Sequence, residues 1–361
     1  MASSEFEEIM EAIRDQWASM AGMAAMFTLS IGFGIFIQPL YNFSEARAFG
    51  EEGTTEAGNI ILELMMIFLF TILIIWLARK GLEALIKAIV FLALGYSLFI
   101  AIGPIVAIVF WVLSLESSVA WLTVTVMTTV GLMFYLHKFP EWYVVNTIGV
   151  LVGSGVIVML GIAFVPVLII FFMILAAVYD HWAVNKSKHM LELADTMIGL
   201  KLPVLLVAPK NTNYTFLEQE GDVMERSEIP ERMPDQGDWV PEEQASKRKT
   251  SGRDALFMGL GDVIFPGMLV ISSITFLPDY GPEVFHFWGG SSKPVHLGAM
   301  LVGLGTLLGG LLGYAALMTQ VARGKPQAGL PLLNGGSILG YLVSGGAFIG
   351  FGELWQDITF F

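Results

Sequence analysis

The sequence has no cysteine, only five histidines and few charged residues. Without cysteine, disulfides, thiolate nucleophiles and cysteine-ligated metals are excluded. No histidine begins a His-Glu-x-x-His pattern, so a zinc protease of that type is not expected. There are 19 basic residues against 32 acidic ones, and this acidic balance argues against binding to nucleic acid. No cleavable signal peptide is expected, because the N-terminus is acidic and its first apolar run is long.

Apolar residues, by contrast, make up 55% of the chain, and the mean hydropathy is +0.70. A bilayer core of ~30 Å needs roughly 20 apolar helical residues per crossing. Apolar stretches of this length predict an all-α polytopic protein that is integral to the membrane and embedded in the lipid bilayer. That bilayer is the cell membrane if the source is prokaryotic. Nine such stretches are present: 18–41, 57–78, 84–113, 119–136, 142–162, 164–184, 255–277, 297–319 and 329–351.

The distribution of basic residues predicts how nine transmembrane helices are oriented. With nine crossings, every lysine and arginine except Arg47 and Lys293 falls on the side of the N-terminus. Because basic residues are retained on the cytoplasmic side, the N-terminus is expected in the cytoplasm and the C-terminus outside.

The long polar loop divides the chain into three predicted regions. Its beginning, 185–201, is expected to continue the sixth helix, and 218–246 is acidic, contains proline and is expected to be mobile. Between them, two short apolar runs flank turn-forming residues, which predicts a small β-hairpin at 202–217. The regions are an N-terminal membrane bundle at 1–184, a cytoplasmic loop at 185–254 and a C-terminal membrane bundle at 255–361.

Two aspartates, Asp180 and Asp262, lie inside apolar stretches. A carboxylate at membrane depth costs at least ~2.5 kcal/mol, so such residues usually mark function. On antiparallel neighbouring helices they would lie at ~9 and ~14 Å below the flanking cytoplasmic charges. One interpretation is a pair that shares a proton and activates water against an amide. The other is a hydrogen-bonded pair that only joins two helices.

The neighbours of these aspartates suggest further roles. Gly259 and Gly261 let a substrate or a facing helix approach closely. Tyr179 is a candidate wall of the site. His181 adjoins Asp180, but a helix neighbour points about 100° away, so packing or an interfacial position is the favoured interpretation.

Three motifs in this order resemble the presenilin and signal peptide peptidase family of intramembrane aspartyl proteases, in its archaeal type. They are Tyr-Asp at 179–180, Gly-Leu-Gly-Asp at 259–262 and Ala-Gly-Leu-Pro at 328–331. The family reads Pro-Ala-Leu, often followed by Pro, at the last motif, so this chain keeps only the leucine and the following proline. Nine spans and a loop between the sixth and seventh are also similar to the family's architecture.

The resemblance implies that Asp180 and Asp262 are the catalytic dyad, with Leu330 and Pro331 beside it. It implies single-pass transmembrane or signal-peptide substrates and no cofactor or metal. A homo-oligomer is left open. The residues predicted to position the substrate are Tyr179, Gly259, Leu260, Gly261, Ala328, Gly329, Leu330 and Pro331.

A substrate that arrives as a helix must be unwound before its amide can be attacked. An exposed strand edge captures an extended backbone by strand addition, and Leu202 to Val207 is the predicted strand. The alternative is a hairpin that only caps the bundle.

Three other classes of membrane protein fit the sequence less well. Buried acids also serve as relays in proton- or cation-coupled transporters, but no repeat relates 18–162 to 164–351. Prepilin peptidases share Gly-x-Gly-Asp but have lysine where this chain has Ile264. The run 152–155 lacks the first glycine of the rhomboid Gly-x-Ser-Gly pattern.

Glycines recur every fourth residue in the last two apolar stretches, a spacing typical of closely packed membrane helices. These glycines are Gly305, Gly309 and Gly313, then Gly336 and Gly340, and then Gly346 and Gly350.

Overall fold

The computed structural model describes residues 2–182, 205–210, 255–285, 293–321 and 329–359. Each of the nine predicted stretches contains an α-helix. Within the described residues, six helices are long and apolar enough to cross a membrane, and two shorter apolar ones cover Pro166–His181 and Leu260–Phe276. The helices are α1 (Ala2–Ile37), α2 (Ala57–Arg79), α3 (Glu83–Val112), α4 (Ser118–Lys138), α5 (Trp142–Gly161), α6 (Pro166–Trp182), α9 (Leu260–Phe276), α10 (Leu297–Val321) and α11 (Leu330–Phe348).

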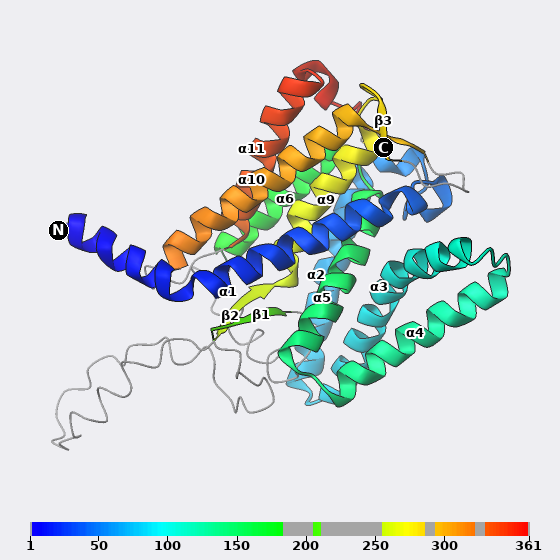
Figure 1. The fold of residues 1–361 in the computed structure, drawn as a ribbon, viewed down its shortest axis with the longest axis horizontal. Coiled ribbons are helices and arrows are strands. Elements are labelled where there is room, and N and C mark those ends of the chain that lie inside the picture. The colour runs from blue at the N-terminus through cyan, green and yellow to red at the C-terminus, as the bar shows by residue number, and fades with distance from the viewer. Residues whose placement is uncertain (1, 183–204, 211–254, 286–292, 322–328, 360–361) are drawn as a thin grey trace.

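The helices form a layered bundle in which α5 and α9 are central (Figure 1). Helices α6, α10 and α11 pack around α9, while α1 and α3 pack on α5, and α4 lies beside α3 at the periphery. In the apolar 18-residue segment of α5, 67% is buried inside the protein, against 17% in the corresponding segment of α2. The side chains of α2 therefore face outward, as expected of a helix that contacts lipid.

A two-stranded antiparallel sheet joins the loop to the start of α9. Strand β1 (Leu205–Pro209) pairs with β2 (Ala255–Gly259), with Leu205 opposite Gly259. The prediction that the seventh helix begins at 255 is therefore wrong, because the chain is a strand up to Gly259. A five-residue apolar run does not distinguish a strand from a helix by periodicity, which explains the error.

Of the predicted hairpin at 202–217, only part of the first strand lies within the described residues. Residues 205–209 do form a strand, but its partner comes from 255–259. The second predicted strand of the hairpin, the helical continuation at 185–201 and the acidic segment at 218–246 lie outside the described residues. A second small sheet, β3 (Glu283–Phe285) with β4 (Val295–His296), lies at the opposite end of α9 (Figure 1).

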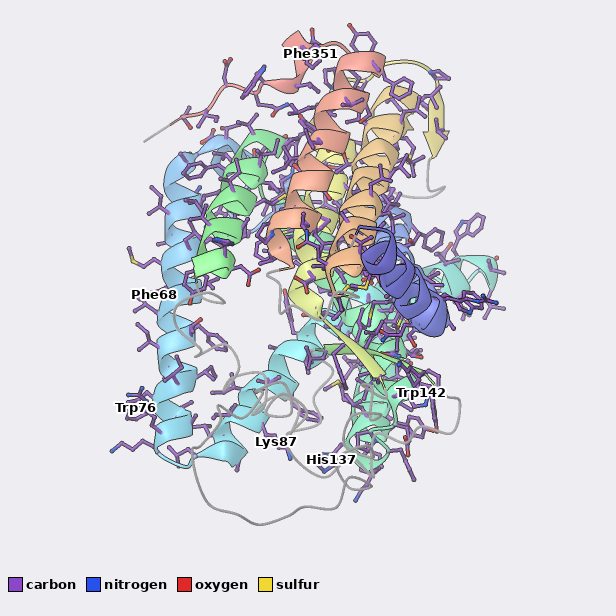
Figure 2. All side chains as sticks on the ribbon, turned by 90° about the vertical axis from the view of Figure 1, so that its left-hand side faces the viewer. Phe68, Trp76, Lys87, His137, Trp142 and Phe351 are labelled. Atoms are coloured by element: carbon purple, nitrogen blue, oxygen red, sulfur yellow. The ribbon has the colours of Figure 1, made fainter. Side chains whose placement is uncertain are left out.

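The two ends of the bundle differ in the residues they carry. Lys87, His137 and Trp142 lie at one end, and Phe351 lies at the other (Figure 2). The predicted orientation requires this separation, since Lys87 and His137 belong to the expected cytoplasmic side. The number of crossings and their direction remain predictions.

The glycines of α10 and α11 form the close contact that their spacing predicts. A β-carbon at Gly309 would collide with the backbone of Gly336 and Gly340, and one at Gly313 would collide with Leu332. The two helices therefore touch backbone to backbone. We call the five glycines on this contact, Gly305, Gly309, Gly313, Gly336 and Gly340, the glycine seam.

The last pair of predicted packing glycines has other roles. Gly346 faces the ring of Phe351, and Gly350 has φ of +105° with nothing within 4 Å of an added β-carbon. For Gly350 the packing prediction is wrong, because a positive φ marks a turn that glycine adopts without strain.

Helix α3 runs unbroken through Pro104. Proline has no N–H, so the carbonyl of Ile100 loses its helical partner. The hydroxyl of Tyr41 donates a hydrogen bond of 2.8 Å to that carbonyl. A neighbouring side chain thus satisfies the backbone group that the proline releases.

Candidate active site

The two aspartates lie at the same end of neighbouring antiparallel helices. Asp180 is in the last turn of α6, and Asp262 is in the first turn of α9. The helices pack through Phe172 and Phe265, whose ring centroids are 5.4 Å apart. The two carboxyl groups are close enough to interact electrostatically. The fold therefore places the two aspartates at one level of the bundle, while their depth in the membrane remains a prediction.

The local sequence explains how Asp262 is held. Gly259 is the extended N-cap of α9, with φ −63° and ψ 140°. Its backbone N–H donates a hydrogen bond to the carboxylate of Asp262, three residues on. This is the acidic half of a capping box, and a carboxylate at a helix N-terminus also interacts favourably with the helix dipole.

Pro266 lies one turn further along α9. Because proline has no N–H, the main-chain carbonyl of Asp262 lacks its usual helical donor. The helix nevertheless continues unbroken from Leu260 to Phe276.

The start of α11 touches both aspartates. The N–H of Leu330 donates a hydrogen bond of 3.3 Å to Oδ2 of Asp180. A β-carbon on Gly329 would lie 3.3 Å from Oδ1 and 3.5 Å from Oδ2 of Asp262. Pro331 follows at the second position of the helix, where its missing N–H costs nothing. Residues 329–330 therefore lie beside both carboxyl groups.

The two carboxyl groups differ in exposure. Asp180 is 5% exposed, and Asp262 is half-buried.

The other predicted site residues are spread around this pair. Tyr179 is 55% exposed, Gly261 is exposed, and Ala328 lies outside the described residues. Leu260 is part of the buried core, and a β-carbon on Gly153 of α5 would lie 3.7 Å from it. Leu260 thus anchors the start of α9 to α5 on the side away from solvent.

Two buried asparagines near the site were missed by the sequence analysis. Asn334 of α11 is 1% exposed, and its Nδ2 donates to the carbonyl of Met173 in α6 at 3.0 Å. It lines an apolar groove of about 380 Å³ between α6 and α11 that reaches His181 and Pro331. A polar residue inside an apolar span was the available signal.

The second is Asn146 of α5, which is 8% exposed. Its Nδ2 donates to the carbonyl of Val207 at 2.7 Å, and the N–H of Val207 donates to its Oδ1 at 2.8 Å. One side chain thus satisfies both backbone groups of a residue in β1.

Fold and site together define a multi-pass membrane protein with two carboxyl groups paired at one end of its helical bundle. The family described as signal-peptide peptidase, presenilin aspartyl protease matches residues 24–350. The chain therefore belongs to this family and is an integral membrane protein and an intramembrane aspartic protease.

Solved structures agree with the family match. A presenilin family intramembrane aspartate protease, solved in space groups C222 and P2, is 25% identical to this chain in both comparisons. The TM-scores are 0.54 and 0.55, with 91% and 92% of this chain and 98% and 99% of the solved chains covered. No curated protein matches the chain. The transporter alternative receives no support from these comparisons.

Proposed function

We propose that Asp180 and Asp262 together hydrolyse peptide bonds within transmembrane segments by general acid and base catalysis with an activated water. The observation that carries this proposal is the contact of residues 329–330 with both carboxyl groups. A segment that binds one aspartate through its N–H and lies against the other holds the pair at a fixed separation.

Two carboxyl groups this close in a low dielectric share one proton. The charged member takes a proton from water as the water oxygen attacks the amide carbonyl. The protonated member gives its proton to the carbonyl oxygen, which yields a tetrahedral intermediate. Return of that proton and transfer of the other to the amide nitrogen release the acid and the amine.

The substrates proposed are single-pass transmembrane segments or signal peptides, delivered through the lipid bilayer. Nine crossings with a cytoplasmic N-terminus would place the dyad and the β1–β2 sheet near the cytoplasmic face. A homo-oligomer is also left open by this proposal.

An extended substrate adds most readily to the outer edge of β2. Both backbone groups of Val207 turn away from β2 toward Asn146. Since pairing alternates along an antiparallel strand, Phe257, opposite Val207, turns its own backbone groups away from β1. Among the described residues, nothing bonds to these groups of Phe257. We therefore propose that β2 captures the substrate, in place of the predicted strand Leu202 to Val207.

The catalytic proposal is tested with the purified protein in detergent and a synthetic single-pass peptide. Asp180→Asn and Asp262→Asn should each lower the cleavage rate by at least about 100-fold, because each removes a general acid or base. The matched control is Asp279→Asn, an exposed carboxylate beyond the other end of α9. Cleavage that persists in either dyad variant at the wild-type rate would rule out the two-aspartate mechanism.

Strand addition is tested at Phe257. Proline at this position removes an N–H that faces away from β1, so the β1–β2 pair stays intact while the outer edge loses its donor. We expect Phe257→Pro to lower kcat/KM about tenfold or more, with Phe257→Leu as the control that keeps the N–H. Equal activity of the two variants would argue against addition to β2.

A further inference from the structure

We propose that Asn146 is a positioning residue that closes the outer edge of β1 and fixes its register. The outer edge of β2, beside Asp262, is then the edge to which the substrate backbone adds. This inference rests on the proposed function, since it concerns how a substrate reaches the dyad.

The geometry of Asn146 is that of a neighbouring strand. Its amide donates to and accepts from the same residue, Val207, at 2.7 and 2.8 Å. A carboxamide is the one side-chain group that reproduces both halves of a backbone peptide. Trp142, one turn earlier on α5, packs against the cluster formed by Val207 and Ala255. Helix α5 thus occupies the place that a third strand would take beside β1.

Helix α1 closes the same edge at its next outward-facing position. The hydroxyl of Ser19, 2% exposed, donates to the carbonyl of Pro209 at 3.1 Å. Pro209 has no N–H, so this one hydrogen bond satisfies its backbone. Strand addition to β1 would have to break the bonds at Val207 and at Pro209.

The same contacts fix the register of the sheet. A shift of one residue would present Leu206 or Ala208 to Asn146, and their backbone groups belong to the bonds with β2. The side chains of β1 would also exchange faces, although Leu206, Val207 and Ala208 are all buried. Because β2 continues directly into α9, the register of β1 helps to place Gly259 and Asp262.

The first experiment measures where a substrate is cut. Asn146→Leu keeps the size of the side chain and removes both hydrogen bonds. With the synthetic single-pass peptide we expect about a tenfold lower kcat/KM and cleavage that spreads to neighbouring bonds, read from product masses. A merely structural role would lower the yield and leave the cleaved bond unchanged.

Two variants of the same helix serve as controls. Ile148→Ala removes a core side chain that is 1% exposed and so lowers stability without touching β1. Thr147→Val alters an exposed residue whose hydroxyl bonds only within α5. Both should cleave at the wild-type bond, and Ile148→Ala should have the lower melting temperature.

The second experiment identifies the edge that binds the substrate. The chain has no cysteine, so single cysteines can be introduced for cross-linking to a cysteine in the peptide. In an Asp180→Asn background that retains the peptide, Phe257→Cys should cross-link and Leu205→Cys should not. Adding Asn146→Leu should make Leu205→Cys reactive as well.

The outcomes separate the role of Asn146 from the function of the two aspartates. Unchanged product masses and an unreactive Leu205→Cys in the Asn146→Leu protein would overturn the role of Asn146 and leave the dyad intact. If Asn146→Leu does not fold, Asn146→Asp is measured in its place, because it keeps the acceptor for the N–H of Val207. Asn146→Asp should show a smaller spread of cleavage sites than expected for Asn146→Leu. Wild-type products from Asn146→Asp would overturn the inference. Failure of the wild-type chain to cleave the peptide would instead contradict the proposed function.

Discussion

Glycine is used in two opposite ways, at the start of α11 and within that helix. Along the glycine seam, Gly309, Gly313, Gly336 and Gly340 face the backbone of the neighbouring helix, and Gly305 faces the side chain of Ser344. At the start of α11, Gly329 faces the carboxylate oxygens of Asp262, at 3.3 and 3.5 Å from where a β-carbon would lie.

The difference lies in what surrounds the missing side chain. At the other four seam glycines, the facing atoms belong to helix backbones, which move only if the whole helix moves. At Gly329 the facing atoms end a side chain, and a small displacement of that carboxylate relieves the contact. The seam glycines therefore serve stability, and Gly329 serves the position of a reactive group.

The largest expected effect tests the seam. In Gly336→Ala the new β-carbon meets the backbone of Gly309 and Gly313. Overpacking of this kind typically destabilises by about 1–3 kcal/mol. The melting temperature in detergent should fall, while the activity per folded molecule stays near the wild-type value. Unchanged stability would mean that α10 and α11 separate at no cost, which contradicts the role of the seam.

A smaller effect of another kind is expected at the dyad. Gly329→Ala should displace the carboxylate of Asp262 by a few tenths of an ångström and lower kcat about tenfold, which is about 1.4 kcal/mol. Its melting temperature should stay close to that of the wild type. A fall in stability with normal activity per folded molecule would place Gly329 with the seam glycines.

The smallest effect is expected at Gly335, the residue directly before a seam glycine. Nothing lies within 4 Å of a β-carbon there. Gly335→Ala should raise stability by about 0.5–1 kcal/mol, since alanine loses less backbone entropy in a helix, and cleavage should be unchanged. It is the matched control for both other variants. A loss of activity here would extend the site into the groove between α6 and α11.

The sequence predicted part of this difference between the packing glycines and the candidate site. The small-xxx-small spacing indicated helix contact at Gly305, Gly309, Gly313, Gly336 and Gly340, and the contact is present. The same pattern failed at Gly350, because spacing carries no information on backbone conformation. Asp180 and Asp262 were prominent because carboxylates are rare inside apolar runs, a property of composition alone.

The residues of this chain by themselves determined its apolar helices, its membrane class and the two acids of the candidate site, because hydrophobic burial acts on each segment locally. Only the tertiary structure decided that the chain before Asp262 is a strand, that β1 pairs with it, and that Asn146 closes the other edge. These outcomes depend on hydrogen-bond partners far apart in sequence, 61 positions for Asn146 and Val207 and 150 for Asp180 and Leu330. No local pattern encodes such pairings, since a backbone group accepts whichever partner the fold brings to it.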